Sequence, residues 1–254
     1  MSLRLGASQS IQKMDTTSQA SAEEKAEFKK TCDGYIEQGL QKNPTIQFLI
    51  KNLIDMGCPP PAGFMRCLDC EGKPVSGGFG MLQEDSVDSS SSRKGDRSNN
   101  FRDKPDCTRP RQDILDQFQR EKEGKSKLSL KPEIYICQEH VAGPKHANTI
   151  LAHELIHAID MCRTKMDPLH NCMHLACTEI RAENLSGECN MSWEFMRGKL
   201  NSYLGHGQEC VRRRAIDSVR ANPNCTQNAA AYVDAAMERC YKDTFPFERH
   251  PNQA

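Results

Sequence analysis

Apolar and polar positions recur at helical spacing along much of the chain. The stretch SAEEKAEFKKTCDGYIEQGL opens with Ser21 three residues before Glu24, which is a capping-box arrangement at a helix start. The stretch NPTIQFLIKNLIDMGC has Asn43 as a cap, Pro44 at the first helical position and Gly57 just past the end. These signals predict an antiparallel pair of helices in the first part of the chain.

The remaining pattern predicts more helices and few strands. Helical periodicity returns at about 110–123, 147–162 and 169–185, and the C-terminal part predicts two helices that break at an Asn-Pro-Asn sequence. Residues 131–138, KPEIYICQ, combine β-branched and aromatic residues after a proline, which predicts a strand. Residues 59–80 are rich in Pro, Gly and Cys and fit short strands or a loop. We therefore expect an α+β fold, mostly helical, with a small sheet beside the helix at 147–162.

Two segments lack the composition of a packed core. Residues 1–20 are polar and predict a disordered N-terminal tail, and residues 84–106 are polar and of low complexity, which predicts a surface insertion. A chain of 254 residues can bury one compact core. We expect a single domain over residues 21–254 that carries this insertion.

Composition excludes several function classes. The chain has 34 Lys and Arg against 34 Asp and Glu, so its formal net charge is zero and nothing indicates a nucleic-acid partner. The basic run VRRR at 211–214 is typical of a solvated helix face. No stretch approaches the ~20 apolar residues of a membrane span. The N-terminus lacks the apolar core of a secretory signal peptide.

Thirteen cysteines are many for a chain of this size. Such density indicates disulfides in an oxidising compartment or a structural metal, and the odd count leaves at least one free thiol. Two pairings suggest themselves. Cys32 and Cys58 would meet across the first helix pair, and Cys210 and Cys240 would lie at one end of a C-terminal helix hairpin. The complete connectivity does not follow from the sequence.

The stretch LAHELIHAIDMCR, residues 151–163, carries the clearest chemistry. His153 and His157 are one turn apart, so a helix presents both imidazoles on one face, where they can bind one metal ion. Glu154 then lies beside the metal and is placed to act as general base and acid. The other positions of this helix are apolar, and histidines on a core helix are costly unless they are satisfied. Zinc peptidases commonly place a substrate-pairing edge strand just upstream, which here is the strand at 131–138.

The third metal ligand has three candidates. Glu179, on the following helix, lies 22 residues after His157, similar to the spacing in thermolysin-like zinc peptidases, and is the preferred candidate. Asp160, one turn after His157, and His174, one turn before Glu179, are the alternatives. For Asp160 a salt bridge or a bond that orients a ligand is the competing role. Three protein ligands would leave the fourth zinc position open for water.

Two charged residues follow Glu179 on the same predicted helix. Glu183, one turn further, suits a carboxylate that orients a ligating imidazole. An exposed charged face is the competing role for Glu183, and for Arg181 we expect that exposed face.

Several longer motifs resemble a known family. HELIHAID.CR, HLACTEIRAENLSGEC, CVRRRAIDSV and C..DTFPF are similar to the mitochondrial inner-membrane metalloproteases that also assist ATP synthase assembly. The resemblance covers roughly residues 30–60 and 130–250. It implies a zincin-like zinc endopeptidase in which His153 and His157 bind Zn²⁺ and Glu154 is catalytic. It does not identify the third ligand.

The same resemblance implies where and on what the protein acts. It implies peripheral association with the mitochondrial inner membrane on the intermembrane-space side, a compartment that forms disulfides. It implies a substrate such as ATP synthase subunit a, whose presequence is removed, and help in assembling the ATP synthase membrane sector. An alternative is a non-proteolytic assembly chaperone whose zinc site is dispensable for that role.

Overall fold

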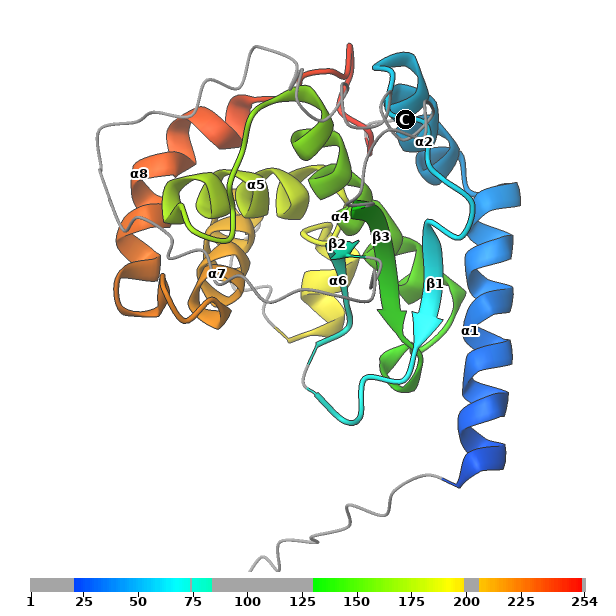
Figure 1. The fold of residues 1–254 in the computed structure, drawn as a ribbon. Helices are drawn as coiled ribbons and strands as arrows, with labels where there is room; N and C mark the ends of the chain where they lie inside the picture. The colour runs from blue at the N-terminus through cyan, green and yellow to red at the C-terminus, as the bar shows by residue number, and fades with distance from the viewer. Residues whose placement is uncertain (1–20, 74, 84–129, 199–205, 253–254) are drawn as a thin grey trace, which may run out of the picture.

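Figure 1 shows the computed structural model, which describes residues 21–73, 75–83, 130–198 and 206–252. In these ranges the helices are α1 (Ala22–Lys42), α2 (Pro44–Asp55), α4 (Pro144–Arg163), α5 (Cys172–Leu185), α6 (Met191–Met196), α7 (His206–Ala221) and α8 (Ala229–Lys242), and the strands are β1 (Met65–Leu68), β2 (Gly77–Gln83) and β3 (Leu130–Cys137). The fold is therefore mostly helical with a small sheet, as the sequence predicts.

The first two helices start at the predicted caps. The Ser21 hydroxyl accepts a hydrogen bond from the Glu24 backbone N–H at 3.2 Å, and the Glu24 carboxylate accepts one from the Ser21 N–H at 2.7 Å. The Asn43 side chain accepts from the N–H groups of Thr45 and Ile46 at the start of α2. Both arrangements satisfy N–H groups that a helix start leaves without an internal partner.

The sheet has the strand order β1-β3-β2. β3 pairs in parallel with β1 and antiparallel with β2, so the strand predicted at 131–138 is present but central. The expectation that it is the edge strand is wrong, and β2 is an edge. A Cβ at Gly77 would lie 2.7 Å from the Tyr135 carbonyl oxygen, and one at Gly78 would lie 2.6 Å from the Tyr135 hydroxyl. Glycine permits this close approach but weakens the strand signal in the sequence.

Helix α4 lies between two groups of elements (Figure 1). On one side it packs against α1, α2 and the strands β2 and β3, with Leu151, Leu155 and Ile159 fully buried in the first core. The helix begins at Pro144, three residues before the expected start, because proline fits the first helical position.

A second core lies on the other side of α4. There α5 packs against α4, and α5, α7 and α8 pack against one another around Ile180, Val219 and Val233, which are completely buried. The two C-terminal helices are those predicted from the sequence, with the Asn-Pro-Asn sequence between them. The helix predicted at about 169–185 is α5, which begins at Cys172 behind the cap Asn171.

Both anticipated disulfides are wrong. The structure pairs Cys32 with Cys67 and Cys58 with Cys162. It pairs Cys189 with Cys210 and Cys177 with Cys240. Each partner is brought close by packing between elements, whereas the expected pairs rested on neighbouring helices alone.

Six disulfides use twelve of the thirteen cysteines, and Cys107 lies outside the described residues. They fall into two sets. Cys32–Cys67, Cys58–Cys162 and Cys70–Cys137 join residues up to the end of α4. Cys172–Cys225, Cys177–Cys240 and Cys189–Cys210 join residues from α5 onward. No disulfide among these six crosses from one set to the other.

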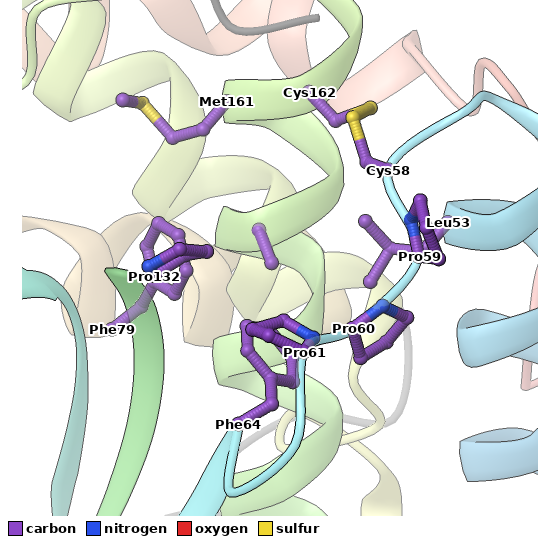
Figure 2. Close-up of a pocket in the computed structure, with 11 residues that line it drawn as sticks. Leu53, Cys58, Pro59, Pro60, Pro61, Phe64, Phe79, Pro132, Met161 and Cys162 are labelled. Carbon is purple, nitrogen blue, oxygen red and sulfur yellow. A yellow bond between two sulfur atoms is a disulfide. The ribbon is translucent and has the colours of Figure 1, made fainter. Parts of the chain in front are cut away.

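A small apolar cavity lies between the second half of α4 and the loop after α2 (Figure 2). The rings of Pro59, Pro60 and Pro61 and the Cys58–Cys162 disulfide form part of its wall. Its volume of about 30 Å³ gives room for little more than one water molecule. We therefore assign it no ligand.

Other predictions lie outside the described residues. These are the tail at 1–20, the insertion at 84–106 and the helix at about 110–123, so the division into one domain with an insertion stays a prediction. Within the part that the structure describes, no helix combines the length and apolar character needed to cross a membrane.

Candidate active site

Two histidines of α4 converge with one glutamate of α5. The Nε2 atom of His153 lies 3.6 Å from Oε2 of Glu179, and Nε2 of His157 lies 3.7 Å from Oε1 of Glu179. One ligand atom from each residue lies within 4.8 Å of the others. The histidines come from α4 and Glu179 comes from α5, so the packing of α4 on α5 creates the cluster.

The spacing in this cluster fits a shared metal ion. Distances of 3.6 and 3.7 Å are too long for ordinary hydrogen bonds between the histidines and Glu179. Two atoms that are each about 2.1 Å from one tetrahedral ion lie roughly 3.4 Å apart. Oε2 of Glu179 is buried and has no hydrogen-bond partner within the described residues. A buried carboxylate oxygen without a hydrogen-bond donor is suited to bind a cation.

Glu154 lies directly beside the cluster. Its side chain is buried on α4, and the backbone N–H of Phe79 on β2 donates a hydrogen bond to its carboxylate. Burial raises the pKa of Glu154 to about 7, because a charged carboxylate is costly away from water. A group with this pKa can take up and release a proton near neutral pH.

The charges around the cluster favour a cation. Burial opposes the charged form of His153, but the carboxylates of Glu179 and Glu188 outweigh it and raise the pKa of His153 well above its usual value. Burial would raise the pKa of Glu179, but the two histidines lower it, so this carboxylate stays ionised. Burial lowers the pKa of His157, which favours the neutral imidazole that binds metals.

A chain of hydrogen bonds fixes the ring of His157. Its Nδ1 lies 2.9 Å from the Thr178 hydroxyl, which donates to Oδ2 of Asp160 at 2.9 Å. Because that hydroxyl proton is used by Asp160, Nδ1 of His157 carries the proton and donates to Thr178. Nε2 is then left without a proton and points at the cluster, as in a metal-binding histidine.

The two alternative third ligands lie elsewhere. Asp160 is completely buried and accepts hydrogen bonds from Arg163, Arg181 and Thr178, so its oxygens are occupied away from the cluster. Nδ1 of His174 accepts a hydrogen bond from the Asp167 backbone, and His174 belongs to neither of the converging groups among the described residues.

The ring of His153 faces a second acidic group. Its Nδ1 lies 3.5 Å from Oε2 of Glu188, and His153, Glu183 and Glu188 also converge within 4.8 Å. Arg214 on α7 binds both carboxylates. Burial and the neighbouring Glu188 raise the pKa of Glu183, whereas His153 and Arg214 overcome burial and lower the pKa of Glu188. The charge therefore lies on Glu188, the carboxylate that faces the imidazole.

The sequence does not predict the roles of several residues around the cluster. Glu183 is buried as expected for a supporting carboxylate, but Glu188 is the one that faces His153. The prediction of an exposed Arg181 is wrong, because this side chain is completely buried beside Asp160. Glu188 lies in a Gly-Glu-Cys turn after α5, and nothing in this local sequence predicts that its carboxylate faces a histidine of α4.

The basic run at 211–214 is not simply a solvated face. Arg212 forms an exposed pair with Asp234, but Arg213 binds the buried Glu194 and Arg214 binds Glu183. The sequence shows that these arginines share a helix, whereas their partners come from packing of α7 against α5 and α6.

The arrangement suits metal-assisted hydrolysis. Two imidazoles and one carboxylate supply three of the four ligands of a tetrahedral metal site, and a buried carboxylate of near-neutral pKa lies beside them. The edge strand β2 borders Glu154 through Phe79 and pairs only with β3 among the described strands. Its other edge offers backbone groups to an extended peptide.

Known proteins with a similar sequence agree with this chemistry. "Mitochondrial inner membrane protease atp23" of Aspergillus niger is 45% identical over 117 residues, which are 45% of this chain and 49% of the relative. The "ATP23 homolog" of Xenopus laevis is 44% identical over 121 residues, 47% of this chain and 51% of the relative. The Yarrowia lipolytica protease is 46% identical over 117 residues, 45% of this chain and 46% of the relative.

The chain spans about half the length of the curated relatives it matches. No solved structure matches it. The model of the Peptidase M76 family matches residues 98–248, a range that contains α4, α5 and all the residues of the cluster. The chain belongs to the Peptidase M76 family.

Proposed function

We propose that this protein is a zinc metalloendopeptidase with a zincin-like site. His153, His157 and Glu179 hold the zinc ion, and Glu154 is the general base. The observation that carries the proposal is the convergence of both Nε2 atoms on the two oxygens of Glu179, at 3.6 and 3.7 Å, beside a buried Glu154.

Each protein group then has a defined task. A zinc ion would polarise the peptide carbonyl as a Lewis acid and lower the pKa of a water molecule at its open position. Glu154 takes a proton from the attacking water and returns it to the leaving amine. Thr178 with Asp160 orients the ring of His157 by hydrogen bonds, and Glu188, which Arg214 binds, faces Nδ1 of His153 at 3.5 Å as a nearby charge.

The substrate lies along β2 as an added antiparallel strand. The Phe79 N–H already bonds Glu154, so a peptide paired with this edge passes next to the general base. Backbone pairing explains binding of an extended segment without demanding one particular sequence.

The site acts at the mitochondrial inner membrane, in peripheral association on the intermembrane-space side. The names of the relatives support the location at this membrane. The motifs that resemble assembly-linked metalloproteases support the substrate, which is the presequence of ATP synthase subunit a or a similar membrane protein. Six disulfides suit a compartment that forms them. The same resemblance supports a part in assembling the ATP synthase membrane sector.

Replacement of Glu154 by Gln tests the peptidase role. The amide keeps the size of the side chain but cannot accept the proton, so we expect peptide cleavage to fall by about 10²–10⁴-fold. Zinc content, measured by elemental analysis, should stay at one ion per chain. Undiminished cleavage by E154Q would refute the role of Glu154. ATP synthase assembly in cells that carry E154Q separates the assembly role from peptidase chemistry.

A further inference from the structure

The short helix α6 presents bulky apolar side chains to solvent. Phe195 is 72% exposed and Met196 is 63% exposed. Glu194, which lies between Trp193 and Phe195 in the sequence, is buried instead and binds Arg213. This ion pair attaches α6 to α7, so the outward direction of the two apolar side chains is part of the fold. Adjacent exposed apolar side chains on a fixed element mark an interaction surface.

Trp193 lies beside these residues, and two cationic side chains lie near its ring. Nζ of Lys145 is 5.3 Å from the ring centroid, and Cζ of Arg197 is 5.6 Å from it. Tryptophan flanked by basic side chains is characteristic of the membrane interface, where the ring meets the headgroups and the cations meet phosphates. The apolar groups of this surface therefore suit the acyl chains of a bilayer leaflet, and its basic groups suit the phosphates of the headgroups.

A polar pocket of about 370 Å³ opens beside the same tryptophan. Lys145 is the only charged residue among the described residues that line it. The lining includes four asparagines, Asn43, Asn148, Asn190 and Asn252. Oδ1 of Asn148 is buried and has no hydrogen-bond partner in the described structure. A pocket with one cation, no acid and many hydrogen-bonding amides suits an anionic, hydroxyl-bearing headgroup.

We propose that Lys145, Trp193, Phe195 and Met196, here called the α6 surface, bind a bilayer that contains anionic phospholipid. Arg197 is left out of this surface, because its guanidinium donates to the Glu188 carbonyl and pairs with Glu194. Phe195 and Met196 enter the leaflet, Trp193 lies at the headgroup level, and a headgroup occupies the pocket with its phosphate on Lys145. The inference rests on the membrane-attached part of the proposed function and supplies its contact surface. It does not depend on peptidase chemistry.

This placement brings the active site close to the membrane. Lys145 and His153 are on the same helix, eight residues and hence about 12 Å apart along its axis. A polypeptide segment that leaves the bilayer beside the α6 surface would need only a few extended residues to reach β2. The surface would thus favour substrates whose cleavage point lies next to a membrane.

The single tryptophan of the chain, Trp193, reports on this surface directly. We expect its fluorescence to shift to the blue on addition of protein-free vesicles of phosphatidylcholine and phosphatidylglycerol, and lipids brominated in the acyl chain to quench it. Vesicles of phosphatidylcholine alone should give a weaker response. The full chain with its disulfides intact is used throughout.

Two variants and a matched control divide the contributions. Phe195→Ser combined with Met196→Ser should weaken partitioning by on the order of tenfold, because apolar area no longer leaves water. Lys145→Gln should weaken binding to phosphatidylglycerol vesicles by about fivefold and leave binding to neutral vesicles unchanged. Leu169→Ser is the control, since Leu169 is 68% exposed but lies beside Asn222, past the end of α7.

The inference is overturned by the absence of a fluorescence shift, by undiminished binding of the double variant, or by equal weakening in Leu169→Ser. If membranes bind the protein only when they retain their own proteins, the partner is a protein and the inference is wrong. E154Q should bind vesicles like the unmodified chain. Vesicle binding with undiminished E154Q cleavage would remove the proposed role of Glu154 as general base and leave the α6 surface in place.

Discussion

At the scale of single residues, the two imidazoles of the cluster are held by different means. His157 donates through Thr178 to the buried Asp160, whereas His153 faces the ionised Glu188 directly. Both arrangements leave Nε2 directed at Glu179. Residues that hold ligands in this way influence metal affinity nearly as much as the ligands do.

Thr178→Val should weaken zinc binding by about 10–100-fold, because it removes the acceptor for Nδ1 of His157 and the donor to Asp160. Competition with a fluorescent zinc chelator measures the change. Thr178→Ser, which retains the hydroxyl, is the control and should bind zinc nearly as well as the unmodified chain. Equal affinities of the Val and Ser variants would show that the hydrogen-bond chain does not support the site.

Arg214→Leu should lower the free energy of unfolding by about 3 kcal/mol, because it leaves the buried carboxylates of Glu183 and Glu188 without their cation. Arg212→Leu is the matched control on the same helix. Its partner Asp234 is exposed, so the expected loss is within about 1 kcal/mol. Urea unfolding of both variants gives the comparison, and similar losses would contradict the assigned role of Arg214.

The sequence could indicate the histidines, Glu154 and Glu179, because they follow from an i, i+4 spacing on one helix and a position on the next. It could not indicate Glu188 or Arg214. Their roles arise only when α7 packs against α5, and no local sequence pattern predicts that these two helices come into contact. Arg181 was misjudged for the same reason, since its buried partner Asp160 is on another helix.

At the scale of elements, the end of α8 is tied to α4 and α5 by a buried ionic cluster. Asp243, just after α8, binds Arg163 of α4 and Arg181 of α5. Burial would raise the pKa of Asp243, but the two arginines outweigh it and lower this pKa. This ionic cluster therefore connects the C-terminal segment to both helices that carry His153, His157 and Glu179.

Stability should fall on acidification because of Asp243. Its pKa is lower in the folded chain than the unfolded value of about 3.9, so its contribution is complete above about pH 4 and is lost as pH falls through the folded pKa. Asp243→Asn should reduce the free energy of unfolding at neutral pH and flatten its acid dependence. Urea unfolding across this pH range checks it, with Asp217→Asn, an exposed pair with Arg220, as the control.

Prediction of elements from the sequence succeeded where caps and periodicity coincide, as in α1 and α2. It also succeeded for the two C-terminal helices, where periodicity and the Asn-Pro-Asn break were sufficient. For residues 59–80 the sequence left short strands and a loop open, because glycines weaken the strand signal, and the structure has β1 and the start of β2 there. Nothing in the sequence indicated α6, which is too short to show a period. The central place of β3 was also missed, because strand order depends on β1 and β2 and not on β3 itself.

At the scale of the whole molecule, the cluster of His153, His157 and Glu179 spans two cores. The histidines belong to the helix that packs on the sheet, and Glu179 belongs to the helix that packs on α7 and α8. An ion bound there would join α4 to α5 and so connect the two cores. Metal binding should therefore stabilise the whole folded chain and not only the residues of the site.

Removal of zinc by a chelator should lower the melting temperature of the entire chain in a single transition. An ion present at about 1,000 times its dissociation constant stabilises the folded state by about 4 kcal/mol. Differential scanning calorimetry before chelation, after it and after zinc is restored measures the effect. His157→Ala should abolish the dependence on zinc, and a melting temperature that chelation leaves unchanged would exclude a bridging ion.

The division of the six disulfides into two sets also fixes which backbone cuts release a fragment. A cut anywhere between residues 84 and 129 leaves the pieces joined by Cys58–Cys162 and Cys70–Cys137. A cut after the exposed Lys165 leaves no disulfide among the six across the break. Between Cys32 and Cys240, the short segment between α4 and α5 is thus the one place where a single protease cleavage crosses none of the six disulfides. Such a cut would leave one polypeptide with both histidines and another with Glu179, with none of these disulfides between them.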